Sequence, residues 1–583
     1  MSISNSPIDD FLYSLRDDHE QAVTKHFEDL VHHSQVDEHT NFETVADFRK
    51  LEESHNLEKS KRKQLRIFRF LILLAIFVVI FLAFLREGIF IFGLVPAAAL
   101  FVYLLKRLNP AIGNRSLIMN DLQEARDDKL SEAWQQMEAL NQLYDWDVTT
   151  QLVQKVIPEF QFDRYLTLNR LQDLQSNFGL SPEFNDYRSI LSCHSGSFKD
   201  NPFALVRYID HRMGNKTYYG SIVIHWTEQQ RDTQGKWITV QRSQTLTASV
   251  TKPFPMYAIE SQLIYGHEAA PNLSFTRTPS KLSGLDKSSW NDWRKQRAVK
   301  GVEKKASRAI RKGTSDLTLM ANREFESLFK AIDRNHEVEF RLLFSPLAQQ
   351  EMVKLLNDNS IGYGDDFNFF KFGKVNFIAS NHLNNVDIEE NPNKYLSFEL
   401  ANARQQFVKH QMEFFKALYF GFAPLWTIPL YQEQRSLPFV DLGLRNNDVT
   451  FWDHEAMANY IGQDTFRHPD SITTNIIKTA STVGRDNTQD VSVTAFGYGG
   501  IDRVDIVVVH GGDNNLHNVP VHWTEYYPVS QQSSMVVARV QGRDVSSYEE
   551  DAEMGNRLSS AMNTRGLDQH SSFFRRGVVA FIQ

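Results

Sequence analysis

The sequence predicts an α+β membrane-anchored protein with an N-terminal transmembrane helical hairpin, a helical stalk and a body with antiparallel β-sheets. Three observations lead to this fold class. Residues 67–85 and 89–105 are nearly unbroken apolar runs, separated only by Arg86-Glu87-Gly88. After about residue 155, runs of β-branched and aromatic residues end at glycine-rich turns. Between these runs lie segments in which apolar residues recur with helical spacing.

The first segment, residues 1–60, is expected to be an acidic helical arm. Residues 1–58 contain fourteen Asp and Glu and four Lys and Arg, a formal charge of −10, whereas the whole chain carries −8. Apolar residues recur at roughly helical spacing in this segment, at positions that include Phe11, Leu15, Leu30 and Phe48. The pattern predicts amphipathic helices with solvated acidic faces.

Residues 61–109 are expected to form a transmembrane hairpin with spans at 67–85 and 89–105. At about 1.5 Å per residue, each run approaches or crosses a hydrocarbon core of about 30 Å. The short connection makes the spans antiparallel, so both ends of the hairpin lie on one side. Basic residues flank those two ends, namely Lys59, Lys61, Arg62, Lys63, Arg66, Lys106 and Arg107. The positive-inside rule therefore predicts a two-span protein of the cell membrane with both termini cytoplasmic.

The next segment, residues 110–155, is expected to be a helical stalk. Leu130, Ala133, Met137, Leu140 and Tyr144 follow one another at steps of three and four residues. This is a stripe of only two heptads, which favours a helix packed on its own domain over an oligomerising coiled coil.

Residues 156–385 and 386–583 are expected to form two α+β regions. In the first, strands at 220–226 and 237–240 flank a turn at 232–235. The second ends in a predicted β-meander with strands at 491–496, 503–510, 516–523 and 535–540, and with turns at 497–500 and 511–515. Helices are expected at 325–329, 346–356 and 401–420. The apolar stretch 417–430 is short and contains two prolines, so it is predicted to be core rather than a third span.

One stretch resembles a known family. Asn322-Arg-Glu-Phe325-Glu-Ser-Leu-Phe329 is followed by Glu339-Phe-Arg341-Leu-Leu-Phe-Ser-Pro346 and by a helix with Leu355 and Leu356. These residues resemble an uncharacterised bacterial family with an N-terminal transmembrane hairpin and a cytoplasmic domain of unknown function. The resemblance covers the hairpin and the region to about residue 380. It implies an architecture and no catalytic residue.

The common enzyme motifs are missing from the sequence. His-Glu pairs occur at His19, His267, His336 and His454, but none has the second histidine four residues later that a zinc helix requires. The single cysteine, Cys193, cannot form a CxxC site, and its neighbour His194 does not make it a nucleophile. Neither a phosphate-binding GxxxxGK[ST] nor a GxSxG motif is present. Tyr363-Gly-Asp-Asp366 is interpreted as a turn rather than a polymerase metal site.

A repeated tetrapeptide supplies the candidate metal ligands. His-Trp-Thr-Glu occurs at 225–228 and at 522–525, each time after a valine-rich strand. If the two copies faced each other, a metal site could form from His225, His522, His510, Asp513 and His517. The favoured interpretation is that Trp226 and Trp523 are core anchors and the histidines lie at the surface. No cofactor is predicted.

A basic segment follows the first β-rich region. Residues 281–312 contain eleven Lys and Arg and three acidic residues, a net charge of +8. A basic amphipathic helix is predicted there, with membrane or partner contacts at Trp290, Trp293, Arg297, Lys300, Lys304, Arg308 and Arg311. It could dock on anionic lipid headgroups, pair with the acidic arm, or remain a solvated helix. Nucleic acid is not expected, because the rest of the chain is acidic and no base-reading motif is present.

The functional expectation is a cytoplasm-facing scaffold or regulatory interaction module that associates with the lipid bilayer, with a protein partner or with copies of itself. A non-enzymatic role is favoured. The alternative is a membrane-attached, metal-assisted hydrolase that uses the histidines near the two His-Trp-Thr-Glu segments.

Overall fold

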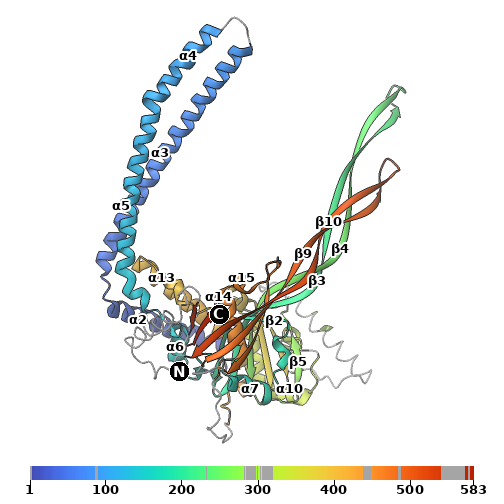
Figure 1. Cartoon of the computed structure of the whole chain (residues 1–583). Coiled ribbons are helices and arrows are strands. Elements are labelled where there is room, and N and C mark those ends of the chain that lie inside the picture. Colours follow the sequence, from blue (N-terminus) through green and yellow to red (C-terminus); the bar gives the residue numbers. More distant parts are fainter. Residues whose placement is uncertain are drawn as a thin grey trace. The chain divides into compact units, whose positions relative to one another are not determined.

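The chain forms two compact units in the computed structural model (Figure 1). The structure describes residues 3–85, 90–231, 233–280, 283, 297, 300–301, 304, 320–331, 333–436, 448–483, 488–539, 572–575 and 578–582. The body contains Met1–Ala22, Trp146–Glu390 and Met412–Gln583, and the helical unit contains Val23–Asp145 and Asn391–Gln411. The units therefore do not follow the consecutive segments expected from the sequence, since the first 22 residues belong to the body.

The helical unit is built around two long helical stretches that lie side by side (Figure 1). Its elements are most of α2 (Arg16–Ser34), then α3 (Glu38–Leu85), α4 (Phe90–Tyr103), the π-helix η2 (Leu104–Leu108), α5 (Asn109–Gln142), η4 (Pro392–Tyr395) and the first part of α13 (Leu400–Trp426). An apolar seam joins α3 to the returning stretch through Ile72, Leu104, Leu108 and Ile112. In the stalk, Ala133, Met137 and Leu140 are fully buried, so this heptad stripe packs within its own unit.

One helical stretch in the described part of the chain, Val95–Gln142, is long and apolar enough to cross a membrane by length and composition. It contains residues 95–105 of the second predicted span, 89–105. The first predicted span, residues 67–85, forms the end of α3, which is helical throughout.

The body has an α+β fold with two antiparallel sheets, which confirms this part of the predicted fold class. The larger sheet has the strand order β1-β2-β3-β4-β7-β6-β5. Its strands are β1 (Phe160–Phe162), β2 (Arg188–Phe198), β3 (Asn201–Arg231), β4 (Trp237–Gly266), β5 (Ser274–Arg277), β6 (Phe367–Phe372) and β7 (Val375–Ser380). The smaller sheet has the order β11-β12-β10-β9-β8. Its strands are β8 (Ile476–Val483), β9 (Thr488–His510), β10 (Leu516–Arg539), β11 (Ser572–Arg575) and β12 (Val578–Ile582).

Helices of the body surround an aromatic core. They are α1 (Pro7–Asp10), η1 (Phe11–Leu15), α6 (Val148–Val156), α7 (Leu168–Ser176), η3 (Pro182–Asn185), α9 (Arg323–Phe329), α10 (Glu337–Leu343), α11 (Pro346–Asn357), α12 (Asn381–Asn385), the end of α13, η5 (Pro429–Gln432), α14 (Phe451–Ile461) and α15 (Gln463–Phe466). Phe11 packs on Phe415 and Tyr419 of α13. Trp426 is 1% exposed, which confirms that the apolar stretch 417–430 is core.

Two hairpins, β3–β4 and β9–β10, are far longer than the usual strand length of 3–10 residues. The predicted turns between β3 and β4 and at 511–515 are confirmed. The predicted turn at 497–500 is wrong, because β9 runs straight through it. Its glycines permit close packing instead. A Cβ on Gly497 would overlap Asn475 and Ser471, and a Cβ on Gly500 would overlap Ile472.

The two hairpins pack face to face and form a two-layer β-arm (Figure 1). Ile224, Leu246 and Ala248 of the first hairpin contact Val519 and Val521 of the second. An ion pair between Lys252 Nζ and Asp505 Oδ2, at 2.7 Å, also joins the layers. Since an isolated two-stranded hairpin is marginally stable in water, this apolar interface stabilises both hairpins.

Gly220 lies where the two layers come closest. A Cβ there would overlap the carbonyl of Pro520 and lie 3.1 Å from Val521 Cα. We therefore expect Gly220→Val to force the layers apart and to lower the free energy of unfolding by about 1–3 kcal/mol. Urea unfolding followed by tryptophan fluorescence measures this change. The adjacent Ser221→Val, which points outward into solvent, is the control and should be nearly neutral. Equal stability of the two variants would contradict this account of the interface.

Candidate functional site

The candidate site begins at an irregularity in β2. The register between β2 and β3 shifts between Ile190 and Ser192, so Leu191 is an extra residue in the strand. Such β-bulges bend a strand and re-aim its side chains, and they are common beside functional sites. Leu191 and Ser192 both line a pocket of the body that has a volume of about 370 Å³.

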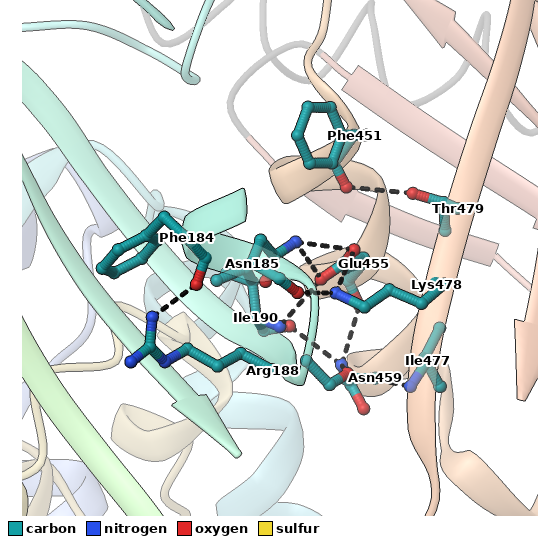
Figure 2. Close-up of polar contacts among 11 residues, drawn as sticks. Phe184, Asn185, Arg188, Ile190, Phe451, Glu455, Asn459, Ile477, Lys478 and Thr479 are labelled. Carbon is teal, nitrogen blue, oxygen red and sulfur yellow. Dashed lines mark hydrogen bonds and ion pairs between the residues drawn. The ribbon is translucent and has the colours of Figure 1, made fainter. Parts of the chain in front are cut away.

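A buried carboxylate holds the strand in place just before the bulge (Figure 2). Glu455 of α14 is fully buried and accepts hydrogen bonds from Asn185 Nδ2, at 2.8 and 2.9 Å, and from the backbone N–H of Ile190, at 3.1 Å. Lys478 of β8 lies 3.3 Å from the same carboxylate and also donates to the backbone oxygen of Asn185. This group of contacts, here called the Glu455 clamp, joins α14, the larger sheet and the smaller sheet.

Asn459, one helical turn after Glu455, continues the clamp towards the pocket (Figure 2). Its Nδ2 donates to Ser189 Oγ and to the backbone oxygen of Ile190, both at 2.8 Å. The backbone N–H of Ile477 in β8 also donates to Ser189 Oγ, at 3.1 Å. Asn459 lines the pocket, and it is fixed directly to β2 and through Ser189 to β8.

Burial shifts both ionisable groups of the clamp towards their neutral forms. Desolvation raises the pKa of Glu455 to about 7, although Lys478 and the hydrogen bonds oppose the shift. Desolvation also lowers the pKa of Lys478 from its ordinary value. The clamp is therefore sensitive to pH near neutrality.

The pocket carries both signs of charge. It is lined by Leu191 and Ser192 of β2, Arg207 of β3, Ile259 of β4, Asn385, Asp387, Glu389, and Asn459 and Tyr460 of α14. Arg207 donates to the backbone oxygens of Asn384, at 3.0 Å, and Val386, at 3.3 Å. These bonds hold the segment with Asp387 and Glu389 against the sheet. Such a lining suits a small polar ligand.

A small inner cavity shares Leu191, Ser192, Glu389 and Tyr460 with this pocket and is also lined by His194 and Glu390. His194 Nδ1 lies 3.5 Å from Glu390 Oε1, and Nε2 lies 2.8 Å from the backbone oxygen of Ile388. Both side chains are buried. Cys193 belongs to an apolar cluster on the other face of β2, so the adjacent cysteine and histidine do not form a nucleophile–base pair.

The structure does not bring His225 and His522 together. Both are exposed, and each alternates with inward residues, Ile224 in one hairpin and Val521 in the other. Because the inner faces of the hairpins pack on each other, the two histidines lie on opposite outer faces of the β-arm. The tryptophans of the repeat point inward, where Trp523 Nε1 donates to Asp505 at 2.9 Å.

The remaining candidate ligands lie near the tip of the second hairpin. His517 Nε2 is 2.9 Å from Asp513 Oδ1, and this hydrogen bond lowers the pKa of Asp513 to about 2. His510 is exposed on the outer face. In the described part of the chain, no three His, Cys, Asp or Glu side chains are grouped so as to hold a metal ion.

Most of the predicted basic helix lies outside the described residues. This applies to Trp290, Trp293, Arg308 and Arg311. Arg297, Lys300 and Lys304 are described, and they are helical and exposed.

The Tyr363-Gly-Asp-Asp366 segment is structural. Asp365 pairs with the buried Arg277, and Asp366 Oδ2 lies 2.6 Å from His382 Nδ1. The ring of His382 stacks on Tyr363, with centroids 4.1 Å apart. These partners occupy both aspartates, in agreement with the interpretation of this segment as a turn.

Sequence reasoning missed the pocket. Its residues come from β2, β3, β4, the end of α12 with the segment after it, and α14, and no two of these segments share a recognisable motif. The sequence did contain one local signal. Glu455 belongs to the pair His454-Glu455, which was considered above only as part of a zinc motif. An acidic residue on the apolar helix 451–461 could instead have indicated a buried carboxylate.

The raised pKa of Glu455 predicts how stability changes with pH. The folded protein keeps this proton up to about pH 7, whereas the unfolded chain releases it near the ordinary value of 4.5. Stability from this group is therefore present at low pH and is lost as pH rises through about 7, by at most about 3 kcal/mol.

Chemical unfolding of wild type and Glu455→Gln across about pH 5–8 should show this loss in the wild type alone. The control, Glu228→Gln on the exposed arm, should behave like the wild type. Identical pH profiles for wild type and Glu455→Gln would contradict the assignment.

Comparisons with known proteins give no relative from which a role could be transferred. No family model matches the chain, and no curated protein or solved structure was found to match it. A functional assignment therefore depends on the geometry of the described residues.

Proposed function

We propose that this chain is an integral membrane scaffold. The end of α3 and the start of the returning helix anchor it in the bilayer, and the β-arm of the body holds copies of the protein together. The observation that carries the proposal is a belt of exposed apolar side chains on the helical unit. A soluble protein rarely exposes so large an apolar surface.

The apolar belt consists of outward-facing side chains on both helices. Its members are Ile67, Phe68, Phe70, Leu71, Leu73, Leu74, Phe77, Val78, Phe81, Val95, Phe101, Val102 and Tyr103. Phe77 is 65% exposed and Val95 66% exposed, although both lie in long apolar runs in which Arg69 is the one charged residue. Lipid is the occupant that suits this belt, since it covers apolar side chains without offering polar partners.

The charges that flank the belt favour one orientation. Basic residues precede the first run and follow the second, at the ends that are joined to the rest of the chain. The positive-inside rule places these ends, and with them both termini, on the cytoplasmic side. The body would then face the cytosol.

The β-arm offers a second exposed apolar surface. Val504, Ile506 and Val508 alternate along the outer face of β9 and are 49%, 57% and 57% exposed, and Leu516 of β10, which pairs with His510, is 70% exposed. The inner faces of the same two hairpins already bury valines against each other. A second copy would bring an identical β-branched face, and a shared membrane would raise its local concentration. We therefore propose another copy of this chain as the occupant of this surface.

Anchoring predicts resistance to alkaline extraction. The wild type should stay in the membrane pellet after carbonate washing. Combined Phe70→Asp, Leu74→Asp and Phe77→Asp should release the protein, because each charge in the bilayer costs about 2.5–3.5 kcal/mol. The matched control is Leu57→Asp, Leu117→Asp and Ile118→Asp, which changes exposed apolar residues of the same helices outside the belt.

The control protein should stay with the membrane. Release of the wild type, or equal release of the two triple variants, would refute the anchor.

Self-association predicts an oligomer in detergent or in lipid nanodiscs. Light scattering should give a mass of at least two chains for the wild type. Combined Ile506→Lys and Val508→Lys should give a monomer, since two buried, unpaired lysines oppose the contact. Val223→Lys, on the opposite outer face of the arm, is the control and should leave the oligomer intact. A monomeric wild type would overturn the scaffold while leaving the anchor unaffected.

A further inference from the structure

The pocket beside α14 is independent of both surfaces in the proposed function. We propose that it binds a small zwitterion with a carboxylate and an ammonium group, the chemical class of free amino acids. The volume, about 370 Å³, lies within the range of small-molecule sites.

The first argument is the hydroxyl of Ser192. Ser192 is 4% exposed and lines the pocket, and its Oγ has no hydrogen-bond partner among the described residues. A buried hydroxyl without a hydrogen-bond partner lowers the free energy of unfolding. Ser192 Oγ therefore does not stabilise the fold. The β-bulge that re-aims this residue is held by the Glu455 clamp. A ligand atom in the pocket would supply the missing bond.

The second argument is the guanidinium of Arg207. A guanidinium has five N–H donors, and the described contacts of Arg207 are two bonds to backbone oxygens. No carboxylate in the described part of the chain is within ion-pair distance of it, although two line the same pocket. Arginine binds carboxylates through paired N–H donors, so this group suits the anionic end of a ligand.

The third argument is the pair of carboxylates on the segment that Arg207 holds against the sheet. Asp387 and Glu389 both line the pocket, while Ile388 between them is fully buried. With Arg207, the lining carries a net charge of −1, which disfavours a phosphate or another polyanion. A ligand with one positive and one negative group matches both signs of charge in the lining. Leu191, Ile259 and Tyr460 provide apolar surface for its side chain.

Other ligand classes fit less well. A metal ion has no group of three suitable side chains among the described residues. An apolar ligand would leave the Oγ of Ser192 without a partner.

Thermal unfolding of the full-length protein in detergent micelles provides the test. The probes are the twenty standard amino acids, each at millimolar concentration. At least one should raise the melting temperature of the wild type, because a ligand that binds only the folded state stabilises it. Calorimetry with that amino acid then gives its affinity. Its decarboxylated amine and its des-amino acid should each bind at least about tenfold more weakly.

Two variants locate the site. Ser192→Ala and Arg207→Met should each weaken binding by about tenfold or more. Ser192→Ala removes no bond within the protein, so its own melting temperature should not fall, which separates loss of binding from misfolding. The matched controls are Ser243→Ala and Arg212→Met, at exposed positions of the neighbouring strands.

Three results would overturn the proposal. One is the absence of any shift with all twenty amino acids. The second is unchanged binding in Ser192→Ala. The third is full binding of the amine or the acid alone, which would show that only one charge is recognised.

Discussion

The body depends on the buried carboxylate of Glu455. Removing a charged or polar group from water costs several kcal/mol unless partners replace the lost solvation. Here the partners come from η3, from the backbone of β2 and from β8, so satisfying this one group fixes three elements. The strand is thereby held just before the bulge. The positions of Ser192 and Asn459 in the lining of the pocket follow from that constraint.

The β-arm follows a different principle, in which two weak elements stabilise each other. Where the hairpins extend beyond the rest of the body, neither has a hydrophobic core of its own. Each hairpin therefore buries one apolar face against the other hairpin. This requires close approach at Gly220 and straight strands through Gly497 and Gly500. The outer faces remain exposed, which makes them available to another copy in the proposed scaffold.

The fold was predictable where the signal was local, and the pocket was not. Alternating apolar residues and the turn at 511–515 indicated the antiparallel strands, and helical spacing indicated α9, α11 and α13. The glycines at 497–500 were misread as a turn because their role depends on Asn475 and Ile472, distant in sequence. The pocket joins five segments through such non-local contacts. Ser192 and Arg207 carry no pattern that marks them in the chain.

The repeated His-Trp-Thr-Glu segments show why equal sequences need not share a site. Alternation in a strand places tryptophan and histidine on opposite faces. In both copies the tryptophan takes the inner face, where Trp523 bonds to Asp505 and stacks under Lys252, 4.3 Å from the ring centroid. Once the inner faces pack together, the two histidines must point away from each other. The repeat is therefore explained by packing between the hairpins, and the chemistry of the body is better sought in the pocket beside α14.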